Sequence, residues 1–596
     1  MSISIQSTPI KGGEFLIRET KAGDVFIPEN WTDEQLMIAH TCQDFIDQKV
    51  IPNLNRIDAQ EDGLMASLLD EAGKLGLCAI SLPEEYGGFG KDFNTSMLVS
   101  EKTGAGASFS VAFSAHTGIA TLPILYYGNK AQMDKYIPKL ATAEWKGAYC
   151  LTEPSAGSDA NAGKTRAILS ADGKFYILNG QKMWITNAGI ADVFTVFAKI
   201  DEDKHMSAFI VEKGMEGFSL NVEEHKMGIK GSSTRQVFFN ECKVPAENLL
   251  SERGNGFKIA LNILNIGRIK LGAAVLGAAK NVITQSVKYA NERHQFGRAI
   301  AEYGAIEYKL AEQVIRTYAT ESAVYRAGQN IEDAIQDLIE NGMDAAEAKL
   351  KGTEQFAIEA AIIKVHASEA LDYVVDEGVQ IYGGMGYSTE APMERAYRDS
   401  RINRIFEGTN EINRLLIVDM MLKRALKGEF DLIGPAKKVA SELLSIPDFN
   451  GTEGDVFDQA KKYIANFKKA VLLVAGAAVQ KLNQALSEQQ EVLMYLADMI
   501  IEVYVSESLQ LRVEKLAGQQ PEKAIEQIEM MKVYVSDAAD RIYKAGKEAL
   551  NSFAEGDERK LMLMGLKRFT KTDDVNTTAG RRKIAAKIIT QNHYCF

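Results

Sequence analysis

The chain has 596 residues, of which 46% are hydrophobic and 25% are charged, and its formal net charge is −12. A chain this long exceeds a single hydrophobic core and predicts about three or four domains. The acidic balance argues against a nucleic-acid-binding protein. The five cysteines include no CxxC pair, which argues against a disulfide framework and against a zinc or other metal site.

The N-terminal stretch contains acidic residues and has no apolar core of secretory length. It therefore predicts no signal or transit peptide and a cytoplasmic location. No apolar run in the sequence reaches the roughly 18–20 residues that a membrane span requires. We expect a protein that touches a membrane at most peripherally.

The first predicted domain, 31–146, is helical. Thr32 followed by Gln35 is the pattern of a capping box at the start of a helix. Further helices are predicted at 63–75, 93–103 and 130–140, and a helix rich in small residues surrounds His116.

The second predicted domain, 147–250, is built of strands. Short segments rich in β-branched and aromatic residues are separated by Gly, Asn and Asp. The pairs Asp172-Gly173 and Asn179-Gly180 are strong turn signals between such segments. We expect an all-β domain of about 100 residues, either a small β-barrel or a sandwich.

Helical patterns return after residue 250. Four long helices are predicted at 255–292, 305–330, 351–382 and 409–427, and together they indicate a four-helix bundle over 251–430. Residues 431–596 form a fourth, C-terminal helical domain. The fold class is therefore mainly α with a central β domain.

The most informative stretch is 401–421. It predicts a short extended segment, a break at Gly408, and a helix with Thr409 as its N-cap and Glu411 in its first turn. The apolar residues that recur at helical spacing, and so predict one buried face, are Ile412, Leu415, Leu416 and Met420.

Glu407 lies just outside this helix, between Phe406 and Gly408. A carboxyl group beside apolar residues can be partly desolvated, which raises its pKa toward the range of roughly 6–7 that suits a general base. The alternative is an ordinary capping or salt-bridged carboxylate, because three arginines lie nearby in sequence: Arg401, Arg404 and Arg414.

Three other segments could bind a planar or phosphorylated ligand. The loop at 149–160 offers hydroxyls and backbone N–H groups, and Trp184 beside Thr186 could stack on a planar ring. The segment 382–387, YGGMGY, has three glycines after a helix. Their structural alternatives are a hydrophilic loop, a core tryptophan and a helix C-cap.

Together these segments resemble the acyl-CoA dehydrogenase family. The matching segments are YCLTEPSAGSD (149–159), KMWITNAG (182–189), NERHQFGRAI (291–300), VQIYGGMGYSTE (379–390) and RIFEGTNEI (404–412). The helical, β, helical order resembles the three-part core of that family. The added C-terminal helical domain, with NILNIGR (262–268) and QFAIEAAIIK (355–364), is most similar to the very-long-chain branch.

The resemblance implies a flavoprotein oxidoreductase of fatty-acid β-oxidation. With FAD as cofactor it would convert a long- or very-long-chain acyl-CoA into the trans-2-enoyl-CoA. Glu407 would remove the α proton while the β hydride passes to flavin N5. The thioester oxygen would be held by the backbone N–H of Glu407 and a ribityl hydroxyl of FAD.

The resemblance also implies the binding residues. Those expected at the isoalloxazine are Leu151, Thr152, Ser158, Trp184, Ile185 and Thr186. Those expected at the adenine and pyrophosphate end are Arg293 and Phe296, with Gln380, Gly383 and Gly384 from a second subunit, and Thr409 and Glu411. Those expected at the acyl-CoA are Ser158, Asn265, Arg268 and Gly408.

The sequence departs from the family pattern at several positions. Gly267 stands where some members carry the base, so Glu407 keeps that role. Gly304 replaces a glutamine that contacts FAD in shorter-chain members, and Asn265 replaces an acid of medium-chain members. Ser110 and Ser114 stand where bulkier residues close the tail pocket of medium-chain enzymes, which predicts a longer acyl cavity.

Partners and alternatives follow from the same resemblance. We expect an electron-transfer flavoprotein as acceptor and a homo-oligomer, specifically a dimer. An acyl-CoA oxidase, which passes electrons to oxygen, and a non-catalytic assembly scaffold of the same fold remain alternatives. The segment 457–482 has four lysines near its start and an apolar run behind them. It either lies at a membrane interface or buries its apolar face against the bundle or against the second copy of a dimer.

Overall fold

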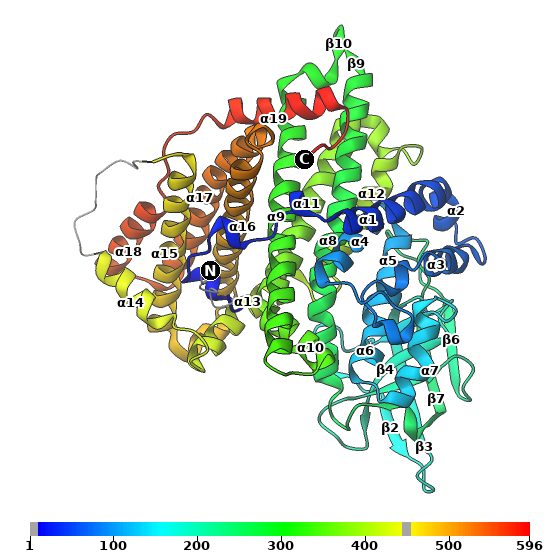
Figure 1. The fold of residues 1–596 in the computed structure, drawn as a ribbon. Coiled ribbons are helices and arrows are strands. Elements are labelled where there is room, and N and C mark those ends of the chain that lie inside the picture. The colour runs from blue at the N-terminus through cyan, green and yellow to red at the C-terminus, as the bar shows by residue number, and fades with distance from the viewer. Residues whose placement is uncertain (1–9, 444–453) are drawn as a thin grey trace, which may run out of the picture.

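The computed structural model describes residues 10–443 and 454–596. Long helices stand in the middle of the molecule, with the N-terminal helices and the sheet on one side and the C-terminal helices on the other (Figure 1). The first nine residues lie outside the described residues. They belong to the N-terminal stretch from which the cytoplasmic location was predicted. The cytoplasmic location stays a prediction.

The N-terminal region is helical, as predicted. Its α-helices are α1 (Asp33–Phe45), α2 (Leu54–Asp58), α3 (Leu64–Lys74), α4 (Phe93–Thr103), α5 (Ser108–Ser114), α6 (Thr121–Tyr127) and α7 (Lys130–Ala141). The capping box at Thr32 is confirmed. The Gln35 N–H donates to Thr32 Oγ1 at 3.3 Å, and the Thr32 N–H donates to Gln35 Oε1 at 3.1 Å.

The central region is a sheet. Its strands are β1 (Gly147–Cys150), β2 (Arg166–Leu169), β3 (Phe175–Thr186), β4 (Val193–Ile200), β5 (Ser207–Glu212), β6 (Phe218–Glu223), β7 (Thr234–Pro245) and β8 (Leu249–Leu250). Their order is β6-β7-β3-β2-β4-β5-β8, with β1 paired to β4. Phe194, Phe209 and Val237 are among the residues that fill its apolar core.

One turn prediction in this region is wrong. Asn179-Gly180 does not end a strand but forms an irregularity within β3, where the pairing with β7 shifts register. Asn179 exchanges hydrogen bonds with Glu241 across the strands at 2.6 and 2.8 Å. Gly180 has φ of 147°, and a Cβ there would lie 2.6 Å from Thr165 Oγ1. The glycine therefore permits a bulge rather than a reversal.

The next region contains the long helices. They are α8 (Gly256–Glu292), α9 (Gly304–Glu340), α10 (Ala345–Gln355), α11 (Ala357–Tyr382), α12 (Pro392–Ser400) and α13 (Asn410–Leu426). Two bounds differ from prediction. Helix α9 continues to Glu340 because Ile331 and Ile335 extend its buried face. The helix predicted at 351–382 is divided at buried Phe356, whose φ of −104° and ψ of 27° leave the helical range.

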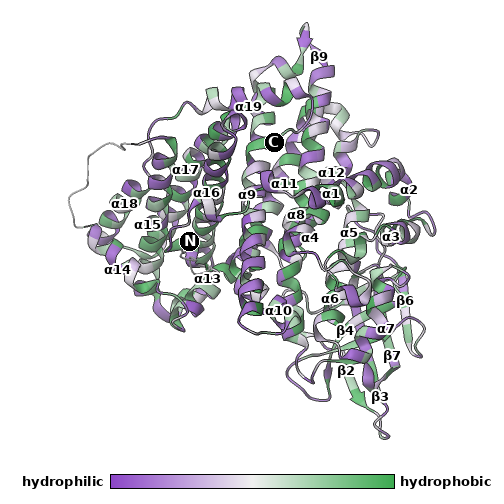
Figure 2. Ribbon diagram, viewed as in Figure 1, coloured by the Kyte–Doolittle hydropathy of each residue, from purple (hydrophilic) through white to green (hydrophobic). Residues whose placement is uncertain are grey.

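The C-terminal region is also helical. Its helices are α14 (Ile433–Glu442), α15 (Val456–Leu482), α16 (Gln490–Gln519), α17 (Ile525–Phe553), α18 (Gly556–Phe569) and α19 (Thr577–Gln591). Hydrophilic and hydrophobic residues are interspersed along them (Figure 2). The apolar run of α15 is packed inside, with Val471, Val474 and Ala478 fully buried. This face of α15 is therefore covered by protein and is not the membrane-binding face considered above.

Two helical stretches are apolar enough to meet the composition of a membrane span, although no such span was expected from the sequence. Ser108–Tyr127 and Gly256–Glu292 could cross a bilayer by length and composition alone. The fractions of their apolar windows that are buried inside the protein are 78% and 72%. Buried core helices of large proteins meet the same composition test.

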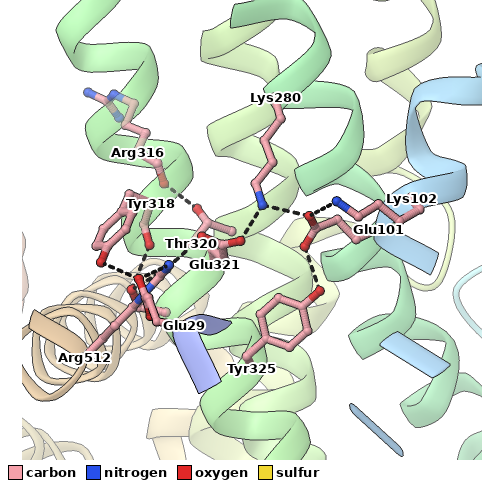
Figure 3. Close-up of polar contacts among 11 residues, drawn as sticks. Glu29, Glu101, Lys102, Lys280, Arg316, Tyr318, Thr320, Glu321, Tyr325 and Arg512 are labelled. Atoms are coloured by element: carbon pink, nitrogen blue, oxygen red, sulfur yellow. Dashed lines mark hydrogen bonds and ion pairs between the residues drawn. The ribbon is translucent and has the colours of Figure 1, made fainter. Parts of the chain in front are cut away.

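A buried network of charges joins the regions (Figure 3). Arg512 of α16 donates to Glu321 of α9 at 2.7 Å and to Glu29 of the N-terminal segment at 2.8 Å. Lys280 of α8 bonds Glu321 and also Glu101 of α4, the latter at 2.7 Å. Each charge has an opposite charge within bonding distance, which a buried ionic network requires.

We predict that Arg512→Met destabilises the protein by about 3–5 kcal/mol, because it leaves the buried carboxylate of Glu321 less compensated. Thermal and urea unfolding measure the loss. Lys130→Met is the control, since Lys130 and Asp134 form an exposed pair, which is worth about 0–1 kcal/mol. Equal losses in the two variants would contradict the importance given to the network.

Candidate active site

Glu407 lies on a tight bend between two helical turns. Arg401–Arg404 form a 3-10 turn, not the extended segment predicted. Glu407 then adopts φ of 59° and Gly408 φ of 83°. A left-handed backbone is uncommon for a residue with a side chain, and it persists where the surroundings enforce it, often at functional sites. Thr409 caps α13 as predicted, with its Oγ1 accepting from Ile412 N at 3.3 Å.

The predicted buried face of α13 is only partly correct. Ile412 is exposed, whereas Leu415, Leu416 and Met420 are half-buried. The residues that are fully buried are Asn410, Asn413, Ile417, Val418 and Met421. Two asparagines point inward because their amides hold neighbouring backbone and side chains, and they rotate the helix away from the register that apolar residues alone would set.

The bend is held from two sides. Arg268 Nε of α8 donates to the Glu407 carbonyl oxygen at 3.0 Å, and Arg268 Nη1 donates to Asn265 Oδ1 at 2.9 Å. Asn413 Nδ2 donates to the Gly408 carbonyl oxygen at 2.8 Å. These charged and amide donors fix the backbone that carries the Glu407 side chain.

The carboxyl group of Glu407 is desolvated. Burial raises its pKa to about 7, against the opposing charges of Arg268 and Lys364. Its Oε2 atom is buried and has no hydrogen-bond partner within the described part of the chain.

Two of the three arginines that could have formed a salt bridge with Glu407 are paired with other acids. Arg404 pairs with Asp372 at 2.9 Å, and Arg414 pairs with Glu369 at 2.8 Å. A free, buried carboxyl with a pKa near neutrality is the form a general base takes.

A cavity of about 230 Å³ opens in front of this carboxyl. Glu407 and Thr186 both line it, so the sheet and the helical region meet here. Ser110 and Ser114 also line it, as the tail-pocket hypothesis requires. Small and apolar residues of α8 form another wall: Ile263, Ile266, Gly267, Leu271, Ala274 and Val275.

The predicted isoalloxazine residues lie on β3 and on the loop after β1. Trp184 is 51% exposed, so the core-tryptophan alternative is wrong. The Thr152 carbonyl accepts from Met183 N at 2.9 Å, which joins loop and strand. Ile185 and Leu151 are buried, and Ser158 is exposed. An exposed indole on a strand that reaches the cavity fits the flat face of a flavin.

A buried ion pair inside the two matching segments fixes that loop. Lys182 Nζ donates to Glu153 Oε1 at 2.7 Å and to the Leu151 carbonyl at 3.2 Å. Glu153 also accepts from Thr165 N at 3.1 Å. No sequence pattern predicted a role for Lys182 or Glu153, although both lie in the segments that resemble the family.

Five of the seven residues predicted for the adenine and pyrophosphate end lie together at one exposed end of α8 and α11, whereas Thr409 and Glu411 lie at the start of α13. Tyr289 and Tyr382, near the ends of these helices, stack with ring centroids 4.0 Å apart. Phe296 beyond α8 is 95% exposed. The other members of this group, all exposed, are Arg293, Gln380, Gly383 and Gly384. That these residues hold FAD, with Gln380, Gly383 and Gly384 contributed by a second subunit, stays a prediction.

The surroundings of three other predicted residues are as follows. Glu411 is exposed in the first turn of α13. The side chain of Asn265 is engaged by Arg268. A Cβ at Gly304 would lie 3.7 Å from Arg582 Nη2 of α19, which places this position beside the C-terminal region.

Residues that sequence reasoning missed surround Glu407. They are Lys364 of α11, Asn410 and Asn413 of α13, and Tyr149 of β1, a phenol whose pKa is raised by burial and by the charge of Glu407. Lys364 carried a signal, since it is the only lysine or arginine in the apolar stretch QFAIEAAIIK. The asparagines carried none, because polar residues in a first helical turn are ordinary.

Nearly the whole length of the chain is similar to known proteins of one family. Family models described as acyl-CoA dehydrogenase N-terminal, middle and C-terminal domains match 32–144, 148–242 and 254–422, and a second C-terminal-domain model matches 466–568. A "Probable acyl-CoA dehydrogenase" of Bacillus subtilis is 45% identical over 98% of both chains. The human very long-chain specific acyl-CoA dehydrogenase is 43% identical over 58% of this chain and 51% of its own.

Solved structures give the same result. A crystal structure of an acyl-CoA dehydrogenase complexed with FAD from Bacillus anthracis is 45% identical, with a TM-score of 0.95 over 98% of this chain and all of that one. Butyryl-CoA dehydrogenase from Megasphaera elsdenii is 35% identical, with a TM-score of 0.60 over 66% of this chain. Sequence identity and structural similarity therefore point to the same family.

We predict that Gly267→Ala raises the pKa of Glu407 by about one unit. A Cβ at 267 would lie 3.0 Å from Glu407 Oε2, so the carboxyl must shift and lose further solvation. Infrared titration of the protonated carboxyl band, assigned by its loss in Glu407→Gln, measures the pKa. Gly518→Ala is the control because a Cβ there meets open space. An unchanged band position and pKa in Gly267→Ala would contradict the close contact.

Proposed function

The chain belongs to the acyl-CoA dehydrogenase family, and from that premise we propose that Glu407 is the general base in the oxidation of long- or very-long-chain acyl-CoA. The activity itself is FAD-dependent dehydrogenation of acyl-CoA, as the family models and the FAD-complexed structure indicate. The observation that carries the proposal is the unpartnered, desolvated carboxyl of Glu407 at the wall of a largely apolar cavity.

Glu407 removes the proton from C2 of the thioester, and a hydrogen leaves C3 with its electron pair, which yields the trans-2-enoyl-CoA. Bound FAD supplies the two-electron acceptor for that hydrogen. Arg268 and Lys364 stabilise the carboxylate form by charge while leaving Glu407 Oε2 free to take the proton. The side chains of Trp184 and Thr186 fit the cofactor beside the cavity.

Long acyl chains are favoured by the shape of the cavity. Small side chains line it on two helices, with Ser110 and Ser114 on α5 and Ala274 on α8. Such residues leave length for an apolar tail, which is held by burial at about 0.8 kcal/mol per methylene group. The similarity to very-long-chain relatives supports the same assignment.

The acceptor and the assembly are also proposals. We propose an electron-transfer flavoprotein as acceptor, which membership of the acyl-CoA dehydrogenase family supports. We also propose a homodimer, because Phe296 is 95% and Tyr387 89% exposed at the end where two subunits are expected to share FAD. Large exposed aromatic side chains are typical of interfaces. Hydrogen peroxide release in air would instead identify an oxidase, and a colourless purified protein would identify a scaffold. We propose that the enzyme works in the cytoplasm.

We predict that Glu407→Gln loses at least a thousandfold in kcat while it still binds FAD and acyl-CoA. In the wild type, kcat/KM should rise about tenfold per pH unit up to a pH near 7 and then level, because only the carboxylate can take the proton. Stopped-flow bleaching of the flavin measures both quantities. Activity of Glu407→Gln near the wild-type level would refute the assignment.

We predict that palmitoyl-CoA (C16) has a higher kcat/KM than octanoyl-CoA (C8). The longer tail buries more methylene groups in the cavity. Steady-state rates with a dye acceptor measure the ratio, and Ser114→Gln should reduce the C16 rate more than the C8 rate by shortening the cavity. Faster turnover of C8 in the wild type would overturn the chain-length proposal.

A further inference from the structure

A buried lysine stands beside the catalytic carboxyl. Lys364 of α11 has no solvent exposure, and its Nζ donates to Asn410 Oδ1 at 2.7 Å. Asn410 begins α13, three positions after Glu407. Lys364 and Arg268 are the two cations whose charges act on Glu407 in the described part of the chain.

Lys364 keeps its charge because acids surround it. Burial lowers the pKa of Lys364 to about 8, Glu407, Glu411 and Glu369 oppose that shift, and Arg268 adds to it. Near neutral pH the ammonium form therefore predominates. A cation in this position favours the carboxylate form of Glu407 without occupying its Oε2 atom.

The partner of Lys364 belongs to a longer chain of contacts. Asn410 Nδ2 donates to Glu369 Oε1 at 3.0 Å. Glu369 accepts from Arg414 Nη1 and Nη2 at 2.8 and 2.9 Å, a bidentate pair. Arg414 Nε donates to Asp498 Oδ1 at 2.7 Å.

This chain of contacts crosses between domains. Asp498 lies on α16 of the C-terminal region, Arg414 and Asn410 lie on α13, and Glu369 and Lys364 lie on α11. Helix α13 packs against both α11 and α16. We call the set Asp498, Arg414, Glu369, Asn410 and Lys364 the base tether. Bidentate pairs fix geometry more strongly than single contacts.

We propose that the C-terminal domain serves catalysis by holding the base loop through this tether, with Lys364 as the positioning residue for Glu407. This assignment rests on the proposed role of Glu407. The tether sets the orientation of α13 at its first turn, and α13 carries the left-handed bend on which Glu407 stands. Lys364 touches neither substrate nor cofactor in this account and acts only through Glu407.

Loss of the Lys364 charge should change the pKa of Glu407 in one direction. A cation lowers the pKa of a nearby carboxyl, so its removal raises that pKa. Lys364→Met should move the low-pH limb of kcat/KM upward by about one pH unit. Lys364→Arg keeps the charge and should restore the wild-type limb. Lys349→Met is the control, because Lys349 is also desolvated but its charged partner is Glu332.

The contact between Asp498 and Arg414 can be tested with a variant of Asp498 and a matched variant of Asp537. Asp498 and Asp537 are both C-terminal acids bonded to an arginine, with side chains 41% and 32% exposed. Asp537 bonds Arg581, which reaches Glu312 of α9 and not α13. Asp498→Asn should lower kcat at least threefold at unchanged KM, whereas Asp537→Asn should not. The double variant Lys364→Met/Asp498→Asn should lose less than the product of the two single losses.

The outcomes separate this inference from the assignment of the base. An active Glu407→Gln would refute the base itself. An inactive Glu407→Gln, together with a wild-type pH limb in Lys364→Met, would refute only the positioning role. If Lys364→Met does not fold, equal kcat values for Asp498→Asn and Asp537→Asn would overturn the tether, and a selective loss in Asp498→Asn would support it.

Discussion

The structure depends on keeping one carboxyl group out of water without pairing it. An ion pair on Glu407 would lower its pKa and engage its oxygens, whereas burial alone would keep it protonated at neutral pH. The fold does neither. Cations act on the Glu407 carboxyl without bonding it, and hydrogen-bond donors bind the backbone around it. Arg268 bonds the Glu407 carbonyl and not its carboxyl. The strained φ of Glu407 is the local consequence, since the side chain must leave the helix to face the cavity.

Ion pairs join elements that are distant in sequence, fully buried at Lys182 and partly exposed at Arg414. Arg512 joins α16 to α9 and to the N-terminal segment, Lys182 holds the loop after β1, and Arg414 joins α13 to α16. The buried pairs among them add little net stability compared with apolar packing, but breaking one is costly. They favour one relative placement of the helices. The site needs that placement, because Thr186 and Glu407 come from different regions and line one cavity.

Much of this arrangement was predictable from local sequence. The domain order, the Thr32 capping box and the Thr409 N-cap follow from patterns within a few residues. The segments that resemble the family contain the residues around the site. Predictions failed where tertiary contacts override local preference. Asn179-Gly180 is a turn pair by composition, yet cross-strand bonds to Glu241 make it a bulge. The register of α13 follows the buried Asn410 and Asn413. Asn410 bonds Lys364 and Glu369, which lie far away in sequence, whereas Asn413 bonds the nearby backbone of the bend. Because Asp498 also lies far away in sequence, no pattern revealed its contact with Arg414.

The account depends on Glu407 acting as the base toward C2 of the substrate. The most direct measurement is exchange of the C2 protons of a 3-thia-acyl-CoA with deuterated water, because sulfur at position 3 has no hydrogen to give up and oxidation cannot follow. Mass spectrometry should show deuterium uptake with the wild type, rising with pH through about 7, and none above background with Glu407→Gln. Equal uptake with both proteins would mean that another group removes the proton and would contradict the account.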